Sequence, residues 1–348
     1  MIPNLKNFKN MKKYKITSQS FLGLLMLVLL GSCREEKKKA VLPESKGVPY
    51  ELLLVVDRNV WNSPMGDSLQ AVLKGSVPGL PQHEPLFKML RVYPENYVQM
   101  YTTMRNTMFV ELDSTLEKPR LAVAYNVKAK PQVYVELKSP DLKGLEHVLM
   151  KHHQEIVDYF VESELNLEAS RLKKRFHRDT EQAALKTFGY RICVPDEMRS
   201  MKQREQFLWA STDLNEKDLN LVMYTFSYDP KAAFSDVVYW VEKRDSVMKK
   251  NIPGSRPDQW MATTWEEDMP IVSLRERMID NRQAWELRGL WELRHGGIGG
   301  PFVSLARVDT AEGKVIVSEG FVYSPRTDKR NLMRRMEAAL RTLEKIKE

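Results

Sequence analysis

Three adjacent carboxylates, Glu266, Glu267 and Asp268, are residues of this 348-residue chain whose type could support hydrolysis. Glycosidases place two carboxyl groups on either side of the scissile bond, one of them as a general acid. The trio directly follows Trp265 in a stretch with loop composition, and its spacing pairs it with no further acid or base. We expect an exposed loop and keep hydrolysis of a polymer as an alternative hypothesis.

Metal binding and nucleophilic catalysis find less support in the residue pattern. His147, His152 and His153 cluster, but metal-binding histidines on one helix usually lie four residues apart, as in H-E-x-x-H. The spacing of five between His147 and His152 predicts different faces of a solvated helix. No G-x-S-x-G elbow frames a nucleophilic serine. We therefore expect no metal, no cofactor and no catalytic residue.

A glycine-rich segment, His295-Gly296-Gly297-Ile298-Gly299-Gly300-Pro301, could cradle a phosphate if a helix followed it. An apolar strand pattern follows instead, which favours a wide hairpin whose glycines supply positive φ. Residues 78–87 hold three prolines in an extended path and predict a rigid crossover whose ends are pinned to the core. If exposed, both segments could dock a partner. The candidate partner-binding residues are Leu80, Pro81, Gln82, Glu84, Pro85, Phe87, Gly296, Gly297, Gly299 and Gly300.

The tetrad WELR occurs twice, beginning at Trp285 and at Trp291. An offset of six is even, so both copies present the same face of a strand. Trp285, Leu287, Trp291 and Leu293 are expected in the core, and Glu286, Arg288, Glu292 and Arg294 on the opposite side, where they can form cross-strand ion pairs if solvated. The alternative is a ligand-binding or glycan-binding site that uses Trp260, Trp265 and Trp291.

The amino-terminal residues indicate export and not a membrane span. Five lysines precede an apolar run at residues 21–30, and about ten residues are too few for a helix that needs roughly twenty. The exit, Leu30-Gly31-Ser32-Cys33, resembles the bacterial lipobox. That resemblance implies a signal peptide at residues 1–32, cleavage before Cys33, and acyl chains such as palmitate on the mature protein.

Removal of that peptide changes the charge and the cysteine inventory. The whole chain carries a net charge of +8, and loss of five lysines leaves 49 basic and 46 acidic residues, a net charge of +3. This small surplus does not support nucleic-acid binding. Cys193 then has no partner for a disulfide within the chain, and its alternating apolar surroundings predict a buried structural thiol.

The residues after Cys33 predict where the protein is attached. Arg34 stands where an aspartate would favour the inner membrane in some bacteria, so the outer membrane is expected. Residues 33–49 are polar and read as a lipidated tether. Glu35 and Glu36 resemble the start of a surface-export signal, but three lysines follow, which favours the periplasmic face over the cell surface.

The remaining length can support two domains, which we place at residues 50–180 and 181–348. The predicted fold class is α+β, with two mostly antiparallel sheets, each covered by helices. Expected strands are 50–57, 97–104, 107–112, 121–127, 132–137, 189–194, 206–211 and 220–227, with further strands in 285–294 and 302–321. Expected helices run through residues 69–73 and over 142–178, 234–250 and 327–347.

Several short motifs together are similar to one known family. The proline segment, Met104-Arg105-Asn106, the lipobox and the WELR to Gly-Gly-Pro hairpin resemble Bacteroidota envelope lipoproteins that carry a domain of unknown function. The resemblance implies envelope localisation and supplies no catalytic residues. The leading hypothesis is a non-enzymatic accessory or scaffold subunit, anchored at the outer membrane, that acts through contacts with an envelope protein.

Overall fold

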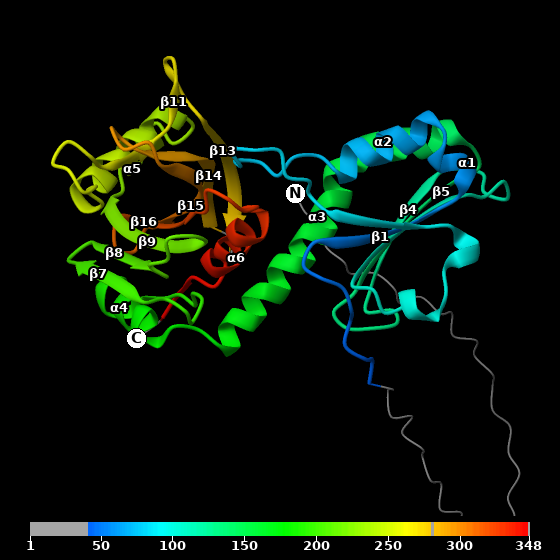
Figure 1. The fold of residues 1–348 in the computed structure, drawn as a ribbon, viewed down its shortest axis with the longest axis horizontal. Coiled ribbons are helices and arrows are strands. Elements are labelled where there is room, and N and C mark those ends of the chain that lie inside the picture. Colours follow the sequence, from blue (N-terminus) through cyan, green and yellow to red (C-terminus); the bar gives the residue numbers. More distant parts are fainter. Residues whose placement is uncertain (1–40, 280–281, 347–348) are drawn as a thin grey trace, which may run out of the picture. The chain divides into compact units, whose positions relative to one another are not determined.

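The structure is a computed structural model that describes residues 41–279 and 282–346, and its fold confirms the α+β class (Figure 1). The amino-terminal half contains β1 Glu51–Val56, α1 Arg58–Trp61, α2 Pro64–Leu73, β2 Lys88–Val92, β3 Asn106–Leu112, β4 Arg120–Tyr125, β5 Val133–Ser139 and α3 Leu142–Lys174. Two short 3-10 helices, Pro94–Asn96 and Gln99–Tyr101, connect β2 to β3.

The carboxyl-terminal half contains more strands than helices. Its helices are α4 Arg178–Phe188, α5 Val237–Asn251 and α6 Arg330–Leu340. Its strands are β6 Tyr190–Arg191, β7 Ser200–Arg204, β8 Phe207–Ser211, β9 Asp218–Ser227, β10 Met261–Thr263, β11 Trp265–Glu266, β12 Met269–Pro270, β13 Val272–Ile279, β14 Arg282–Leu293, β15 Gly299–Asp309, β16 Lys314–Tyr323 and β17 Glu344–Lys345.

The first sheet has the order β2-β1-β3-β5-β4. The sequence predicted a mostly antiparallel sheet, and for this sheet the prediction is wrong. β1 runs parallel to β2 and β3, and β3 runs parallel to β5; the β4–β5 hairpin is antiparallel. Burial of both faces of β1 is the reason for its continuous apolar sequence. Leu52 and Leu54 belong to the core that includes α3, whereas Leu53 and Val55 pack with aromatic rings on the other face.

The prediction of a strand at residues 97–104 is wrong. This segment forms 3-10 turns, and its rings cover the far face of the first sheet. Tyr97 meets Phe109 of β3 edge to face, with ring centroids 5.2 Å apart, and stacks with Tyr101. Aromatic residues favour strands only where they fit a pleated surface, and here they serve as the layer that covers one.

The last residues of the expected tether, 43–49, are bound to the first half of the protein, and residues 33–40 lie outside the described part of the chain. From Pro43 onward the backbone hydrogen-bonds to the first half: Lys130 N donates to Pro43 O, and Lys46 N donates to Thr103 O. Arg105 Nη2 donates to Gly47 O at 2.8 Å, so the Met104-Arg105-Asn106 motif holds this entry segment.

The second sheet is antiparallel throughout its described strands, as expected. Its order is β10-β14-β15-β16-β9-β8-β7, with β13 paired to β14. One face packs against α6, and the other against α5, where Trp240 meets the ring of Trp285 at 5.3 Å. The predicted apolar stripe of β14 is confirmed for Trp285, Leu287 and Trp291, all of which are buried.

The helix expected over 142–178 is α3, which ends four residues earlier, at Lys174. A separate helix that was not predicted, α4, begins at Arg178 with His177 as its N-cap. The helix expected over 327–347 ends at Leu340, after which Thr342 Oγ1 donates to Ala339 O. The strand expected at 189–194 shrinks to β6, which pairs with β17. Helices α1 and α4 were not predicted, and neither were strands β2, β7, β10, β11, β12, β13 and β17.

Candidate functional site

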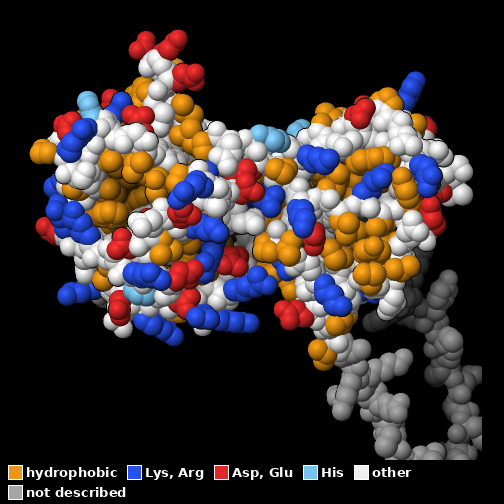
Figure 2. All heavy atoms as spheres, viewed as in Figure 1, with side chains coloured by type: hydrophobic (Ala, Val, Ile, Leu, Met, Phe, Trp, Pro, Cys, Tyr) orange, Lys and Arg blue, Asp and Glu red, His pale blue; other side chains and the backbone are white. Residues whose placement is uncertain are grey.

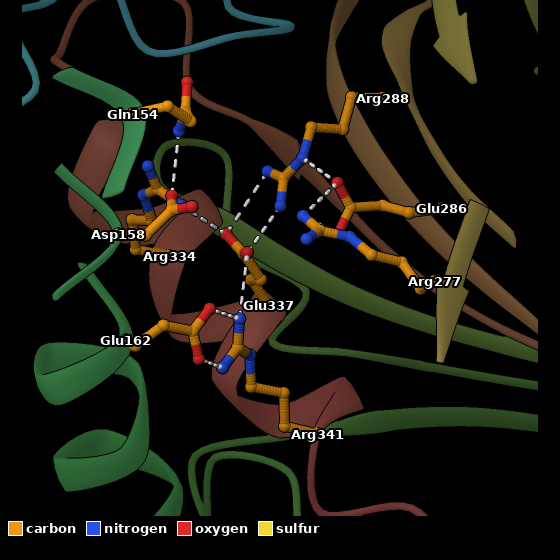
Figure 3. A network of polar contacts seen from close by, with 9 residues as sticks. All are labelled: Gln154, Asp158, Glu162, Arg277, Glu286, Arg288, Arg334, Glu337 and Arg341. Carbon is orange, nitrogen blue, oxygen red and sulfur yellow. Dashed lines mark hydrogen bonds and ion pairs between the residues drawn. The ribbon is translucent and has the colours of Figure 1, made fainter. Parts of the chain in front are cut away.

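A buried arginine–carboxylate cluster lies where α6 passes beneath β14 (Figure 3). At its centre Glu337 of α6 accepts hydrogen bonds from Arg288 of β14 through Nη1 at 3.2 Å and also through Nη2. Arg334, one turn earlier on α6, donates to the same carboxylate at 2.8 Å. Both oxygens of Glu337 are therefore satisfied by cations. A buried charge is tolerated only when it is paired and hydrogen-bonded in this way.

Three further ion pairs extend the cluster, two through Glu286 toward β13 and one through Arg341 toward α3. Arg288 Nε donates to Glu286 at 2.8 Å, and Arg277 Nη2 of β13 lies 3.2 and 3.3 Å from the two oxygens of Glu286. Glu162 of α3 binds both terminal nitrogens of Arg341, with one contact at 2.8 Å (Figure 3). The cluster thus joins β13, β14, α3 and α6.

The electrostatic state of the cluster follows from burial and proximity. Burial by itself raises the pKa of Glu337, but the charges of Arg288 and Arg334 outweigh it and lower that pKa well below its ordinary value. The pKa of Glu286 is lowered for the same reason, chiefly by Arg288 after the opposing effect of burial. The neighbouring carboxylates raise the pKa of Arg288 although burial opposes this. These groups remain ionised at neutral pH.

A cavity of about 360 Å³ opens beside the cluster. Its lining combines apolar side chains from α2, the proline segment and α3 with arginines that come from β13, β14 and α6 or its carboxyl end, and α3 also contributes Asp158 and Glu162. The apolar side chains include Val72, Leu86, Met150, Val157 and Val161, and the arginines are Arg275, Arg277, Arg288, Arg334 and Arg341. A pocket lined by both apolar and charged side chains can orient a ligand that has two unlike ends.

Sequence reasoning did not identify this cluster as a site. The alternation of side chains placed Glu286 and Arg288 together on the polar side of β14 and predicted cross-strand ion pairs there on the condition that this side is solvated. In the structure Glu286 is only 4% exposed, and its carboxylate is held by Arg277 of β13 and Arg288 of β14. The sequence did contain a signal for a buried charged site, because Glu286 and Arg288 alternate with core residues on β14. The partner acids and bases are too far away in the chain for any spacing rule to find them.

The proline segment, residues 78–87, connects α2 to β2 and also binds the start of α6. Glu84 is buried and accepts hydrogen bonds from the backbone N–H groups of Lys329 and Arg330, both at 2.7 Å. Its carboxylate therefore satisfies two of the donors that the start of a helix leaves without partners. Arg330 also donates to the carbonyl of Pro85. Phe87 is buried as well, so neither it nor Glu84 is available to an outside partner.

The rest of the segment is more open, and part of it meets the glycine-rich loop. Leu80 is partly buried against the core, whereas Pro81 and Gln82 are exposed. Pro81 lines a second cavity, of about 500 Å³, together with residues 295–300. The two segments that the sequence singled out for contact are thus adjacent.

The glycine-rich loop is a hairpin connection, as predicted, between β14 and β15. Gly297 has φ 73° in the turn. A Cβ at Gly300 would lie 2.1 Å from the carbonyl oxygen of Val322, so close strand approach requires glycine there. Gly296 is half-buried, Gly297 and Gly299 are exposed, and Gly300 is buried.

The three candidate tryptophans do not form one exposed platform. Trp291 is 5% exposed and donates through Nε1 to Val322 O at 3.3 Å, which withdraws it from the surface. Trp260 is half-buried, with the Lys249 ammonium 4.4 Å from its ring centre and His295 at 6.2 Å. Trp265 is half-buried in the β11–β12 hairpin.

The acidic trio occupies the exposed tip of that hairpin, where acidic side chains stand out in Figure 2. None of the three side chains forms an ion pair with another described residue. His147 and His152 both line one groove beside β4, and α3 has non-helical backbone angles at His152 (φ −117°, ψ 16°).

Within residues 41–279 and 282–346, no group of three or more His, Cys, Asp or Glu is placed to hold a metal ion. The same described part of the chain has no helix long and apolar enough to cross a membrane. Cys33 lies outside it. Cys193 is a buried free thiol, as predicted, and burial raises the pKa of that thiol.

Comparison with known proteins divides the chain into two parts. No curated protein matches it. Residues 45–173 match the model of a domain of unknown function, DUF8532. Residues 177–342 match the model of a second domain of unknown function, DUF4837. In sequence order, then, the chain is similar first to DUF8532 and then to DUF4837, two families without an assigned activity.

Proposed function

We propose that this protein is an envelope lipoprotein that acts without catalysis, as an accessory subunit that binds another envelope protein. The observation that carries the proposal is the cavity of about 500 Å³ shared by Pro81 and residues 295–300. Its rim is built on two adjacent strands, β14 and β15, which give the loop a rigid base. We call this rim the Pro–Gly surface.

The composition of the Pro–Gly surface suits contact with a protein. Pro81 is exposed, and Ile298 is 40% exposed at the tip of the hairpin. The carbonyl of His295 is held by Arg256 and by Gln259 Nε2, the latter at 2.8 Å, which restrains the loop before any partner arrives. A preorganised loop loses less conformational entropy on binding. The alternative, a ligand-binding lipoprotein, would use the same cavity together with Trp260, whose ring centre lies 6.2 Å from that of His295.

Site-directed crosslinking in intact cells tests the contact. A photo-reactive amino acid at Ile298 should give one discrete adduct with an envelope protein, and the Pro81→Asp variant should lose it because a charge then faces the contact. The matched control is Ala311, which is exposed in the β15–β16 turn. Absence of an adduct at Ile298, or equal adducts at both positions, contradicts the proposal.

The anchor at the outer membrane is the second part of the proposal. Its support is the Lys-rich start, the short apolar run and Leu30-Gly31-Ser32-Cys33. The Cys33→Ala variant should lose the lipid, as mass spectrometry of the amino-terminal peptide would show, and should no longer sediment with outer membranes. Cys193→Ala is the matched control and should remain in that fraction.

The face of the membrane is tested on the same cells. For the periplasmic side we expect protection from added protease in intact cells and cleavage after the outer membrane is permeabilised. Cleavage in intact cells would place the protein on the surface.

A further inference from the structure

We propose that the cavity of about 360 Å³ beside the arginine–carboxylate cluster binds a small amphiphilic carboxylate. The site is separate from the Pro–Gly surface, and the inference does not depend on a protein partner. We call it the arginine cavity.

The charges around the arginine cavity do not cancel. Five arginines line it, against the three acids Asp158, Glu162 and Glu337, with Glu286 bonded behind them. The surplus is one positive charge. A ligand with a single negative charge would neutralise this surplus, whereas a cation would be repelled.

The acids near the arginine cavity are already occupied. Glu337 is held by Arg288 and Arg334, and Glu162 by Arg341. Asp158 accepts from Gln154 Nε2 at 2.8 Å. These carboxylates therefore compete little with a ligand for the arginine N–H groups that have no partner.

Those remaining donors belong to three arginines. Arg275 is exposed, and its side chain has no hydrogen bond or ion pair with any described residue. Arg277 uses only Nη2, on Glu286. Arg334 is 7% exposed, and its Nε is buried without a hydrogen-bond partner among the described residues. Guanidinium groups bind carboxylates in planar, bidentate geometry, so Arg275 and Arg277 can hold the head of the ligand.

The apolar part of the lining selects the rest of the ligand. Val72, Leu86, Val157 and Val161 contribute apolar side chains to the same cavity as the arginines. A volume of about 360 Å³ is at the lower end of the size range of ligand pockets. A short apolar body attached to the carboxylate fits both the size and the surface.

Calorimetric titration of the purified, lipidated full chain in detergent at pH 7 tests the proposal, with a blank titration into detergent alone. Hexanoate is the probe. Acetate has the head without the apolar body, and hexylamine has the body with the opposite charge. We expect saturable heat for hexanoate in the millimolar range, binding at least about tenfold weaker for acetate, and none for hexylamine.

The variants Arg275→Gln and Arg277→Gln should each weaken hexanoate binding by about tenfold, since each removes a charged hydrogen bond. Arg275→Gln removes no side-chain hydrogen bond or ion pair with a described residue, and an unchanged melting temperature would confirm that it folds. Arg199→Gln, at an exposed arginine away from the cavity, is the matched control and should bind like the wild type. Equal affinity of hexanoate for Arg275→Gln and the wild type, or no saturable heat up to about 10 mM, overturns the proposal.

Discussion

At the scale of single residues, Glu337 shows how a buried charge is made tolerable. The carboxylate is 3% exposed, and transfer of such a group from water costs several kcal/mol. Arg288 and Arg334 offset this cost with hydrogen bonds from two elements of the fold. Removing the carboxylate leaves those arginines buried without a partner, which is worse than losing the attraction alone.

The Glu337→Gln variant should therefore lose about 3–5 kcal/mol of free energy of unfolding at pH 7, the cost typical of breaking a buried ion pair. Urea denaturation followed by circular dichroism measures it. Glu267→Gln, in the exposed β11–β12 turn, is the matched substitution and should stay within about 0.5 kcal/mol of the wild type. A loss for Glu337→Gln no larger than that of the control would mean that the cluster contributes little.

The lowered pKa of Glu337 predicts how the free energy of unfolding changes with pH. Its pKa is lowered in the folded protein from an ordinary value of 4.5, so folding favours the ionised form. Its contribution to stability is complete above the unfolded pKa and is lost as the pH falls below about 4.5 toward the folded value. The free energy of unfolding of the wild type should fall more steeply between about pH 5 and pH 3 than that of Glu337→Gln. Parallel curves would contradict this.

At the scale of elements, α6 depends on a residue far from it in the chain. The helix has no side-chain cap of its own at Lys329, and Glu84 of the proline segment accepts from its first N–H groups instead. This arrangement fixes where α6 begins, and so where Arg334, Glu337 and Arg341 project.

Glu84→Ala should lower the free energy of unfolding by about 2 kcal/mol, as loss of a strong helix cap does. Amide hydrogen exchange should also speed up in the first turn of α6. Glu95→Ala, at an exposed glutamate in the 3-10 segment, is the control. Unchanged exchange in α6 would show that the hydrogen bonds from Glu84 do not stabilise the start of this helix.

At the scale of the whole molecule, one hydrophobic core includes residues of both sheets. Leu54 of β1, Phe160 of α3 and Leu340 of α6 belong to the same buried cluster. Phe160 also meets Phe87 edge to face, with ring centroids 5.8 Å apart. A shared core couples the stability of the elements around it.

Phe160→Ala should therefore cost about 3–5 kcal/mol and shift unfolding as a single transition. Six of the seven tryptophans follow residue 200, so their fluorescence reports on the second sheet. The fluorescence midpoint should move as far as the circular dichroism midpoint. Tyr125→Ala, at an exposed ring on β4, is the control. An unmoved fluorescence midpoint would show that the sheets unfold independently.

Local patterns determined much of the element list. The apolar run of β1, the hairpin of β4 and β5, the helix α5 and the two faces of β14 all follow from periodicity and turn chemistry within a few residues. The buried state of Cys193 follows in the same way. These features depend on neighbours in the chain, which a sequence displays directly.

Other features depend on residues that the chain brings together only when folded. The parallel pairing of β1 with β3, and the half-exposed strand β13, have no local signature. The arginine–carboxylate cluster combines Glu162, Arg288 and Glu337. Glu162 and Arg288 lie more than a hundred residues apart in the chain, and Arg288 and Glu337 lie about fifty apart. The sequence by itself determined which strand faces carry charge. Only the tertiary structure decided which of those charges would be buried together, because desolvation and pairing are set by what packs on top of them.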